Sequence, residues 1–388
     1  MFCKNEGDFN LTTIKYIGFY TKDKDHGTRH GSIAATNKMD YICCAINDAG
    51  YNVNIISPSW IDDDRKGFHS QYTITESESK TITFAPSFGT KNRYLKKLTV
   101  IYSKIWLLLY LIQCIDKNEK VLVYHSPYLV NIILWIKNIK KINLILEVNE
   151  IYSDVKIFSN NIKKNEYKLF SLADSYIFAT ELLNEKLNAE KKHYAINYGT
   201  YRIQEEKKCK FADDKIHIVY AGIINKLKGS LMAVKTAAHL DNKYHIHIIG
   251  FGSNNDVIFT KKLIQQISKE TTCKVTYDGL LNGEEYITFL QKCNIGLSTQ
   301  SPEAAYNDTS FPSKVLSYLA NGLRVVSIRI KAIEQSEIGN MIYFYEKDTP
   351  ESIAKSIENI DFVAAYDSRK KIQELNKNFI TRIKRLFS

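Results

Sequence analysis

The chain has 388 residues. A single hydrophobic core usually does not extend over a chain of this length, so two domains are expected. Hydrophobic residues make up 44% and charged residues 24%, an ordinary globular composition that excludes a disordered chain. The net charge of +11 comes from Lys and Arg residues dispersed along the sequence, without a zinc-finger or RNA-recognition motif, so no nucleic-acid partner is expected.

The cysteines and the apolar segments limit the compartment and the cofactors. Seven cysteines without CxxC spacing predict neither a disulfide framework nor a zinc site, and no metal is assigned. The first ten residues lack the apolar segment of a signal peptide, and the apolar run 105–114 is too short to span a bilayer. These features predict a cytoplasmic protein that is soluble or at most peripheral to a membrane.

The first half of the sequence alternates strand and helix patterns. A strand over 14–20, a polar glycine-containing loop, a helix over 32–49 and a strand over 51–56 form a βαβ unit. The later segments 121–124 and 143–146 are apolar nearly throughout, as strands covered on both faces should be. The first half therefore predicts a parallel sheet with helices on both sides.

The same pattern restarts after the charged stretch 204–215. Strands are predicted at 216–220, 244–249, 274–277, 295–298 and 341–345, with helices at 230–240, 284–293 and 312–321. Two separate βαβ series predict an α/β chain of two doubly wound, Rossmann-like domains, covering 1–200 and 201–388, the second with a terminal helix. Ligands of such sheets bind beyond the carboxyl ends of the strands.

The segment 307–322 has the pattern of an anion site at the start of a helix. Ser310 suits the N-cap, Pro312 suits the first turn, and Asn321-Gly322 ends the helix. The first backbone N–H groups and the helix dipole would both favour an anion, and Lys314 adds a full charge. The alternative is a well-capped helix without a ligand.

Two segments resemble a known enzyme family. Residues 222–229 (GIINKLKG) resemble the GRLxxxKG loop of GT-B glycosyltransferases of the retaining family 4 type, and residues 309–326 (TSFPSKVLSYLANGLRVV) resemble a later segment of those enzymes. The resemblance covers roughly 210–365 and the N-terminal half only in outline. It implies the GT-B architecture, two Rossmann-like domains facing each other across a cleft. It also implies a metal-independent glycosyltransferase with a nucleotide diphosphate sugar as co-substrate and no cofactor.

The resemblance assigns the donor site to the C-terminal domain. Lys228 matches the lysine that pairs with the donor diphosphate, and 309–313 with the following helix match the backbone cradle for it. The expected donor-binding residues are Gly222, Lys228, Thr309, Ser310, Phe311, Ser313, Lys314 and Ser317.

The chain departs from the family at three positions. The family's loop arginine is Ile223 here, and its paired glutamates are replaced by Thr309 and Ser317. The donor sugar and the choice between retaining and inverting outcomes are therefore left open. Asp308 is expected to replace the lost carboxylate that contacts the transferred sugar, and the alternative is a solvated loop aspartate.

The N-terminal domain is expected to supply further catalytic and acceptor-side residues. His125 resembles the family's histidine that approaches the donor sugar, with a buried structural histidine as the alternative. Glu150 is expected to act as the base toward the acceptor hydroxyl, although Glu147 lies in the same acidic segment. The expected catalytic set is therefore His125, Glu150 and Asp308. Arg29 and His30, in the loop after the first strand, are expected on the acceptor side.

Basic residues precede the apolar segment 105–115: Lys91, Arg93, Lys96, Lys97 and Lys104. Such residues beside Trp106 and a run of leucines suit the surface of an anionic membrane. The alternative is an amphipathic core helix with a solvated, charged start.

The expected function is transfer of a sugar from a nucleotide diphosphate sugar to a hydroxyl of a cell-envelope glycan precursor. A lipid-linked precursor would place the chain in the cytoplasm at the inner face of the cell membrane. Two alternatives are a nucleotide-sugar epimerase of the same architecture and a non-catalytic partner subunit of a glycosyltransferase.

Overall fold

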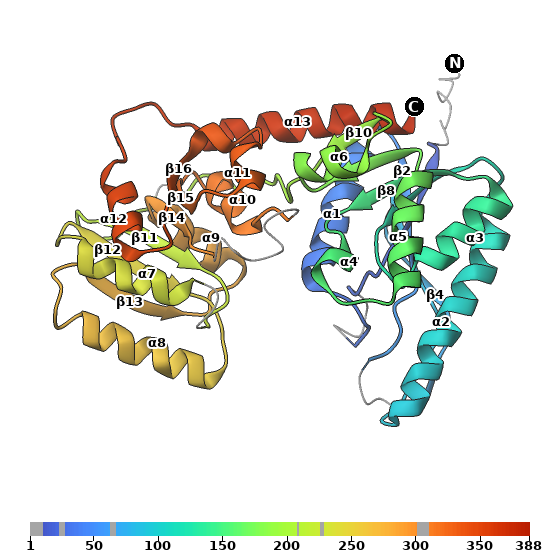
Figure 1. Cartoon of the computed structure of the whole chain (residues 1–388), viewed down its shortest axis with the longest axis horizontal. Helices are drawn as coiled ribbons and strands as arrows, with labels where there is room; N and C mark the ends of the chain where they lie inside the picture. The colour runs from blue at the N-terminus through green and yellow to red at the C-terminus, as the bar shows by residue number, and fades with distance from the viewer. Residues whose placement is uncertain (1–10, 23–27, 63–66, 208, 226–228, 301–309) are drawn as a thin grey trace, which may run out of the picture. The chain divides into compact units, whose positions relative to one another are not determined.

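The computed structural model describes residues 11–22, 28–62, 67–207, 209–225, 229–300 and 310–388. The chain divides into two compact units (Figure 1). The N-terminal unit contains Met1–Ala179, Leu183–Asn197 and Asn378–Ser388, and the C-terminal unit contains Thr180–Leu182 and Tyr198–Lys377.

The described part of the N-terminal unit is built around an eight-stranded sheet in the order β10-β9-β8-β7-β1-β2-β5-β4. Its strands are β1 (Thr13–Ile17), β2 (Asn52–Ser57), β4 (Tyr72–Ser77), β5 (Lys80–Phe84), β7 (Lys120–Tyr124), β8 (Asn143–Val148), β9 (Ser175–Phe178) and β10 (Tyr194–Ile196). The neighbours are parallel except β4 and β5. Strand order reverses at β1, which lies between β2 and β7, so the sheet is doubly wound as predicted.

Helices connect these strands. They are α1 (Ile33–Asp48), α2 (Arg93–Cys114), α3 (Val130–Lys140), the short α4 (Tyr152–Val155), α5 (Asn160–Leu172) and α6 (Glu181–Leu187). Helices α2, α3 and α5 lie side by side (Figure 1). Leu107 and Leu111 of α2 and Ile133 and Ile136 of α3 are buried, which places the hydrophobic core under this layer.

The stretch between β2 and α2 is strand-rich, which the sequence analysis did not predict. Besides the β4–β5 hairpin, β3 (Gly67–His69) pairs antiparallel with β6 (Ser87–Gly89). Strand β4 alternates the half-buried Tyr72 and Ile74 with the exposed Thr73 and Thr75, the pattern of an antiparallel edge rather than of a buried parallel strand.

The described part of the C-terminal unit contains a six-stranded parallel sheet in the order β13-β12-β11-β14-β15-β16. Its strands are β11 (Ile216–Ala221), β12 (Tyr244–Ile249), β13 (Lys274–Gly279), β14 (Ile295–Ser298), β15 (Arg324–Ile328) and β16 (Ile342–Tyr345). The order runs outward in both directions from β11 and β14, so the ligand-binding switch point lies between these two strands.

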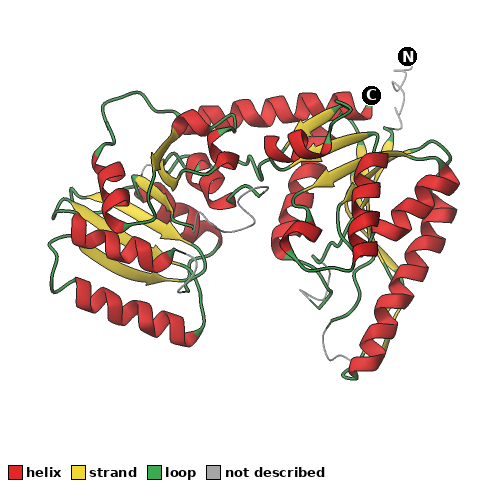
Figure 2. Ribbon diagram, in the orientation of Figure 1, coloured by secondary structure: helices red, strands yellow, loops and turns green. Residues whose placement is uncertain are grey.

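Helices flank this sheet in Figure 2. They are α7 (Ser230–Thr236), α8 (Asn254–Ile267), α9 (Gly283–Lys292), α10 (Ser313–Ala320), α11 (Lys331–Glu334) and α12 (Pro350–Glu358), with 3-10 turns η1 (Ala237–His239) and η3 (Gly339–Met341). The expectation that Ser310 caps α10 is wrong. Pro312 has extended backbone angles and occupies the N-cap, so α10 starts at Ser313 without a side-chain cap.

The C-terminal helix is α13 (Ser368–Phe387). The unit to which its last residues belong differs from the domain boundaries expected from the sequence. Its last residues, Asn378–Ser388, group with the N-terminal unit instead of with a domain 201–388. Buried aromatic contacts explain this: Phe379 stacks on Tyr41 at a ring separation of 5.8 Å, and Phe387 lies 5.7 Å from Tyr51.

Candidate active site

The main cavity of the C-terminal unit lies at the switch point of its sheet and has a volume of about 870 Å³. Loops that follow β11, β12, β13 and β14 contribute Gly222, Gly250, Leu280 and Gln300, and the start of α10 closes one side. This is where an open α/β sheet is expected to bind its ligand.

Two glycines allow the backbones around this cavity to approach each other. A Cβ on Gly250, where φ is +137°, would lie 1.8 Å from the carbonyl oxygen of Gly222. A Cβ on Gly229, where φ is +82°, would lie 1.3 Å from the carbonyl oxygen of Thr299. Because neither position has room for a side chain, only glycine permits these loop contacts.

The positively charged side of the cavity is formed by the first turn of α10. Ser313 and Lys314 both line the cavity, and the first N–H groups of a helix have no partner within the helix. The ammonium group of Lys314 lies 4.2 Å from the centre of the Tyr220 ring, beside Gly222. A helix start and a lysine together form a site suited to phosphate.

The other side of the cavity is largely apolar. Leu280, Leu281 and Ile287 line it together with Tyr286, whose hydroxyl is 3.2 Å from the Ser317 hydroxyl. Arg202 also lines the cavity, a cation that the sequence analysis did not identify. It lies in the irregular segment that joins β10 to β11, outside any motif, so no pattern pointed to it.

The predicted donor residues divide into three groups. Gly222, Ser313, Lys314 and Ser317 line the cavity together. Lys228, Asp308 and Thr309 lie outside the residues that the structure describes. Ser310 and Phe311 do not line this cavity, and the Phe311 ring is buried at 4.8 Å from the ring of Tyr198.

In the N-terminal unit, His125 is buried rather than open to a ligand. Its side chain is 1% exposed, packs near Tyr152 and Phe170, and places Nε2 3.2 Å from Oε1 of Glu166. The structure therefore supports the structural alternative for His125. Sequence reasoning missed Glu166 because a lone carboxylate inside the helix α5 gives no local signal.

Glu166 also holds the loop that follows β8. Its carboxylate accepts backbone hydrogen bonds from Tyr152 at 3.1 Å and Ser153 at 3.0 Å. Burial raises the pKa of Glu166, but the neighbouring His125 ring and the hydrogen bond from Ser153 outweigh this effect and leave the pKa lowered. Glu166 thus holds the backbone at Tyr152 and Ser153, two and three residues after Glu150.

The two candidate glutamates of this segment lie in different environments. Glu147 is fully buried, accepts a hydrogen bond from Tyr16, and lies 3.9 Å from the ammonium of Lys38. Burial raises the pKa of Glu147 and lowers the pKa of Lys38, while their mutual attraction opposes both shifts. Glu150 is only half-buried at the end of the strand, so it is the more accessible carboxylate.

Arg29 has a structural position instead of the expected acceptor-side one. It is 4% exposed, donates to the carbonyl oxygens of Ser59 and Ala85, and its guanidinium lies over the rings of Tyr72 and Phe84. A buried guanidinium needs such backbone acceptors, and no sequence pattern indicated them.

His30 belongs to an aromatic cluster beside the end of β1. It stacks on Trp60 at 4.1 Å and lies edge-on to Phe19 and Tyr128, while its Nδ1 is 3.1 Å from Oδ2 of Asp62. Trp60 is buried, whereas His30 and Tyr128 remain partly exposed. This cluster, defined by Phe19, His30, Trp60 and Tyr128, can present ring faces to a ligand.

Residues 215–360 match the sequence family described as "Glycosyl transferases group 1". The matched segment runs from the start of β11 to the end of α12 and contains the loops after β11–β14 and the start of α10, which form most of the cavity wall. Among curated proteins, no sequence relative was found.

Solved structures resemble the whole chain. HepE of Anabaena, in complex with UDP, has 12% identity and a TM-score of 0.61, covering 97% of this chain and 98% of HepE. A glycosyltransferase from Rickettsia africae has 14% identity and a TM-score of 0.61, with 97% of each chain covered. The UDP-forming alpha,alpha-trehalose-phosphate synthase of Burkholderia xenovorans, in complex with glucose-6-phosphate, has 8% identity, a TM-score of 0.58 and 97% and 98% coverage.

These likenesses confirm the predicted fold, a GT-B architecture of two Rossmann-like domains. The group 1 match over residues 215–360 supports a glycosyltransferase of this class.

Proposed function

We propose that the C-terminal cavity binds a nucleoside diphosphate sugar, with UDP as its nucleotide part, and that the chain transfers the sugar to an acceptor hydroxyl. The observation that carries this proposal is the convergence of Lys314, the start of α10 and the Gly222 loop in one cavity at the switch point. The segment with the group 1 match supplies these groups, and HepE of Anabaena has the same fold and was solved with UDP.

The two sides of the cavity suit the two ends of such a donor. The diphosphate would lie against the first turn of α10 and Lys314, where backbone N–H groups and a full charge stabilise the charge of the leaving group without a metal ion. The apolar side with Leu280, Leu281 and Tyr286 would hold the nucleoside. Lys228, beyond the described residues, would add a second contact to the diphosphate.

Calorimetric titration with UDP, GDP and ADP tests this proposal directly. UDP should bind with the highest affinity, and UDP-sugars should raise the unfolding temperature because they bind only the folded state. Equal, negligible heats for all three nucleotides would contradict the proposal.

The transferred sugar requires a contact that replaces the family's lost glutamate. We assign it to Asp308, which directly precedes the segment leading to α10. Asp308→Asn should lower turnover far more than UDP affinity, because the nucleotide is held elsewhere and the sugar's orientation sets the reaction geometry. Unchanged turnover would leave Asp308 a solvated loop residue.

The two alternatives give different results with wild-type protein. An epimerase would convert a UDP-sugar into its epimer without releasing UDP. A partner subunit would bind UDP without turning over any donor, even with acceptors present. Slow release of UDP from a donor in water, accelerated by an acceptor, would support the transferase.

For the acceptor, we propose a hydroxyl of a cell-envelope glycan precursor, with its sugar ring against the aromatic cluster. The partly exposed faces of His30 and Tyr128 suit stacking on a sugar, and the half-buried Glu150 would serve as the base. The trehalose-phosphate synthase of Burkholderia xenovorans, which has the same fold, was solved in complex with glucose-6-phosphate. A soluble sugar phosphate is therefore the second acceptor to test, beside the glycan precursor.

We also propose that α2 contacts an anionic membrane surface. No helix in the described part of the chain has the length and apolar character needed to cross a bilayer. On α2, however, an apolar stripe is exposed along several turns: Tyr94, Leu98, Ile101, Ile105 and Leu109. The residues 91–115 include five basic side chains and no acidic one, which suits anionic lipid headgroups and a lipid-linked acceptor.

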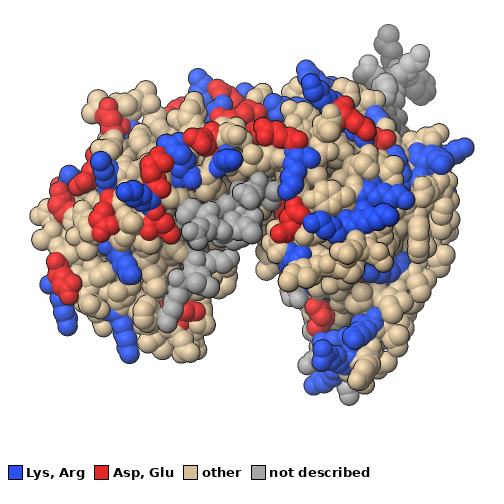
Figure 3. Space-filling view, in the orientation of Figure 1, with Lys and Arg blue, Asp and Glu red and all other residues tan. Residues whose placement is uncertain are grey.

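Figure 3 shows basic side chains gathered over the N-terminal end of α2. Lys91, Arg93 and Lys97 are exposed there, next to the start of the stripe. The buried side of α2 instead contains Thr99, Ser103, Leu107 and Leu111. The more apolar side of this helix is therefore the exposed one, the reverse of an ordinary amphipathic core helix.

A further inference from the structure

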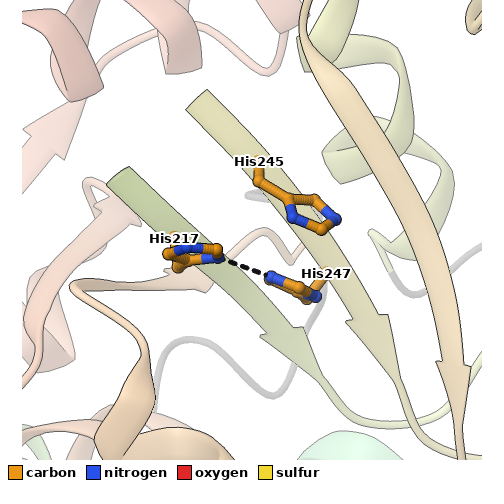
Figure 4. Close-up of side chains that lie close together, drawn as sticks. All are labelled: His217, His245 and His247. Carbon is orange, nitrogen blue, oxygen red and sulfur yellow. Dashed lines mark hydrogen bonds between the residues drawn. The ribbon is translucent and has the colours of Figure 1, made fainter. Parts of the chain in front are cut away.

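Three buried histidines lie together on one face of the C-terminal sheet, away from the candidate active site. His217 on β11 and His245 on β12 are paired neighbours, and His247 follows His245 by two residues on the same face. Figure 4 shows the three rings close together, with one nitrogen of the His245 ring turned toward the other two rings. Each side chain is at most 5% exposed.

One nitrogen from each ring can be chosen so that all three atoms lie within 4.8 Å of one another. Nδ1 of His217 and Nε2 of His247 are only 2.9 Å apart. Cysteine spacings in the sequence give no indication of this cluster. The sequence shows only a His-x-His pattern on one strand and a single histidine on another. These residues are seen to lie together only when the register of the two strands is known.

The outer nitrogens of two rings point to carboxylates. Nε2 of His217 is 2.6 Å from Oδ1 of Asp213, and Nδ1 of His247 is 3.1 Å from Oδ2 of Asp278. Ionised carboxylates only accept hydrogen bonds, so each of these outer nitrogens carries a hydrogen. With both rings neutral, the inner nitrogens of His217 and His247, 2.9 Å apart, present their lone pairs to each other.

The third ring follows the same arrangement. Thr276 donates its hydroxyl hydrogen to Asp278 at 2.8 Å, so its oxygen accepts from Nε2 of His245 at 3.0 Å. This leaves Nδ1 of His245 as a lone-pair nitrogen, buried and without a hydrogen-bond partner. An unsatisfied buried acceptor is costly, and three lone pairs in one buried site favour a bound cation.

We propose that His217, His245 and His247 bind a divalent transition-metal ion, with zinc as the ion to test. Neutral imidazole is a preferred ligand of such ions, and the second nitrogen of a ligating histidine usually donates to a carboxylate or another acceptor, as all three do here. With metal–nitrogen bonds of about 2.0–2.1 Å, a separation of 2.9 Å between two ligand atoms corresponds to an angle of roughly 90°. Only a small adjustment would open it to a tetrahedral value.

The position of the site assigns the ion a structural role. His217 lies near the start of β11, five residues before Gly222 in the candidate active site, a distance of about 17 Å along a strand. Phe211 stacks on His217 at 4.0 Å and on His247 at 4.9 Å, and Phe289 of α9 lies edge-on to His247. The bound ion would join β11 to β12 beneath this aromatic cover and stabilise the C-terminal unit.

The test uses the full chain after removal of metals with a chelator and dialysis. Addition of Zn²⁺ should restore about one ion per chain and raise the unfolding temperature by about 5 °C or more. The double variant His245→Ala/His247→Ala should lose the bound ion and the temperature shift. The matched control is His239→Ala, which removes a half-exposed histidine in a surface pair with Glu351.

The wild-type protein alone provides a second measurement, in case the double variant fails to fold. Loaded with Co²⁺, it should show X-ray absorption consistent with three imidazole ligands. Absence of tight Zn²⁺ binding by the wild type would overturn the proposal and favour a proton shared between His217 and His247. Fewer than two imidazole ligands in the Co²⁺ protein, or undiminished Zn²⁺ binding in a folded double variant, would overturn it as well.

Discussion

At the scale of single residues, the cavity and the core impose different requirements on charged side chains. Lys314 combines a ring contact with Tyr220 and a position at the start of α10, so its ammonium faces the proposed diphosphate. Glu166 instead stabilises the N-terminal unit from within. Substitutions at these two residues should therefore affect different properties, binding in one case and stability in the other.

Lys314→Ala should weaken UDP binding with little change in stability. Loss of one charge-assisted phosphate contact costs about 1.5–3 kcal/mol, a factor of roughly 10–150 in the dissociation constant. Calorimetry measures this change. Lys355→Ala, which removes an exposed lysine of α12 in the same unit, should leave UDP affinity unchanged. Equal affinities of Lys314→Ala and wild type would remove Lys314 from the donor site.

Glu166→Gln should destabilise the protein by about 1–3 kcal/mol, because the amide can accept only one of the two backbone hydrogen bonds, turns an NH2 group toward the other donor and removes the charge beside His125. The lowered pKa of Glu166 adds a pH dependence. Its stabilisation is complete above the ordinary glutamate pKa and is lost as pH falls through the lower pKa of the folded state. The difference between wild type and variant should therefore shrink under acid conditions.

Thermal unfolding across this pH range measures the effect. Glu150→Gln is the matched control, because that half-buried carboxylate lies in the same segment and should alter stability by less than about 0.5 kcal/mol. A constant difference between Glu166→Gln and wild type from neutral to acid pH would show that the charge of Glu166 does not contribute.

At the scale of elements, the sequence predicted the regular parts of the fold well. The expected strand 295–298 is β14, and the expected helix 32–49 corresponds to α1 (Ile33–Asp48), since apolar runs and glycine stops define these elements locally. The hairpin β4–β5 was missed because the exposed residues of β4 are polar, so this strand lacks the apolar run that marks the buried strands. The start of α10 was misplaced because a serine near a proline resembles a cap whether or not it makes the hydrogen bond.

The candidate sites were predictable only where a motif lies within one loop. Gly222, expected from the resemblance of its loop, and Lys314, expected from the helix-start pattern, both line the cavity. Arg29 and His125 had equally suggestive neighbours in sequence, but both are buried, and burial depends on residues far away in the chain. The same limit hid Glu166 and the three histidines.

Helix α2 carries its own prediction. Leu98→Glu/Ile105→Glu should reduce binding to anionic vesicles, because two charges interrupt the exposed apolar stripe and repel acidic headgroups. Sedimentation with phosphatidylserine-containing vesicles, compared with neutral vesicles, measures the loss. Ile258→Glu alters an equally exposed apolar residue of α8 and should have little effect. Equal binding of wild type to neutral and anionic vesicles would contradict membrane contact through this helix.

At the scale of the whole molecule, the chain ends in the unit where it begins. Helix α13 starts among residues of the C-terminal unit, but Phe379, Ile383, Leu386 and Phe387 are buried with the N-terminal unit. Because these four side chains are remote in sequence from the rest of that unit, its core is completed only when the last residues of the chain are in place. The two units should therefore respond differently to changes at the C-terminus.

Phe379→Ala should destabilise the N-terminal unit by about 3–5 kcal/mol, because it removes a side chain that is 1% exposed and stacked on Tyr41. UDP affinity should change little, since the proposed donor cavity is lined by residues of the C-terminal unit. Thermal unfolding should show a transition that moves to lower temperature, together with a transition that UDP still shifts upward. Lys384→Ala, at an exposed position of the same helix segment, is the matched control and should leave both transitions in place. Parallel loss of both transitions and of UDP binding in Phe379→Ala would show instead that the two units fold as one cooperative body.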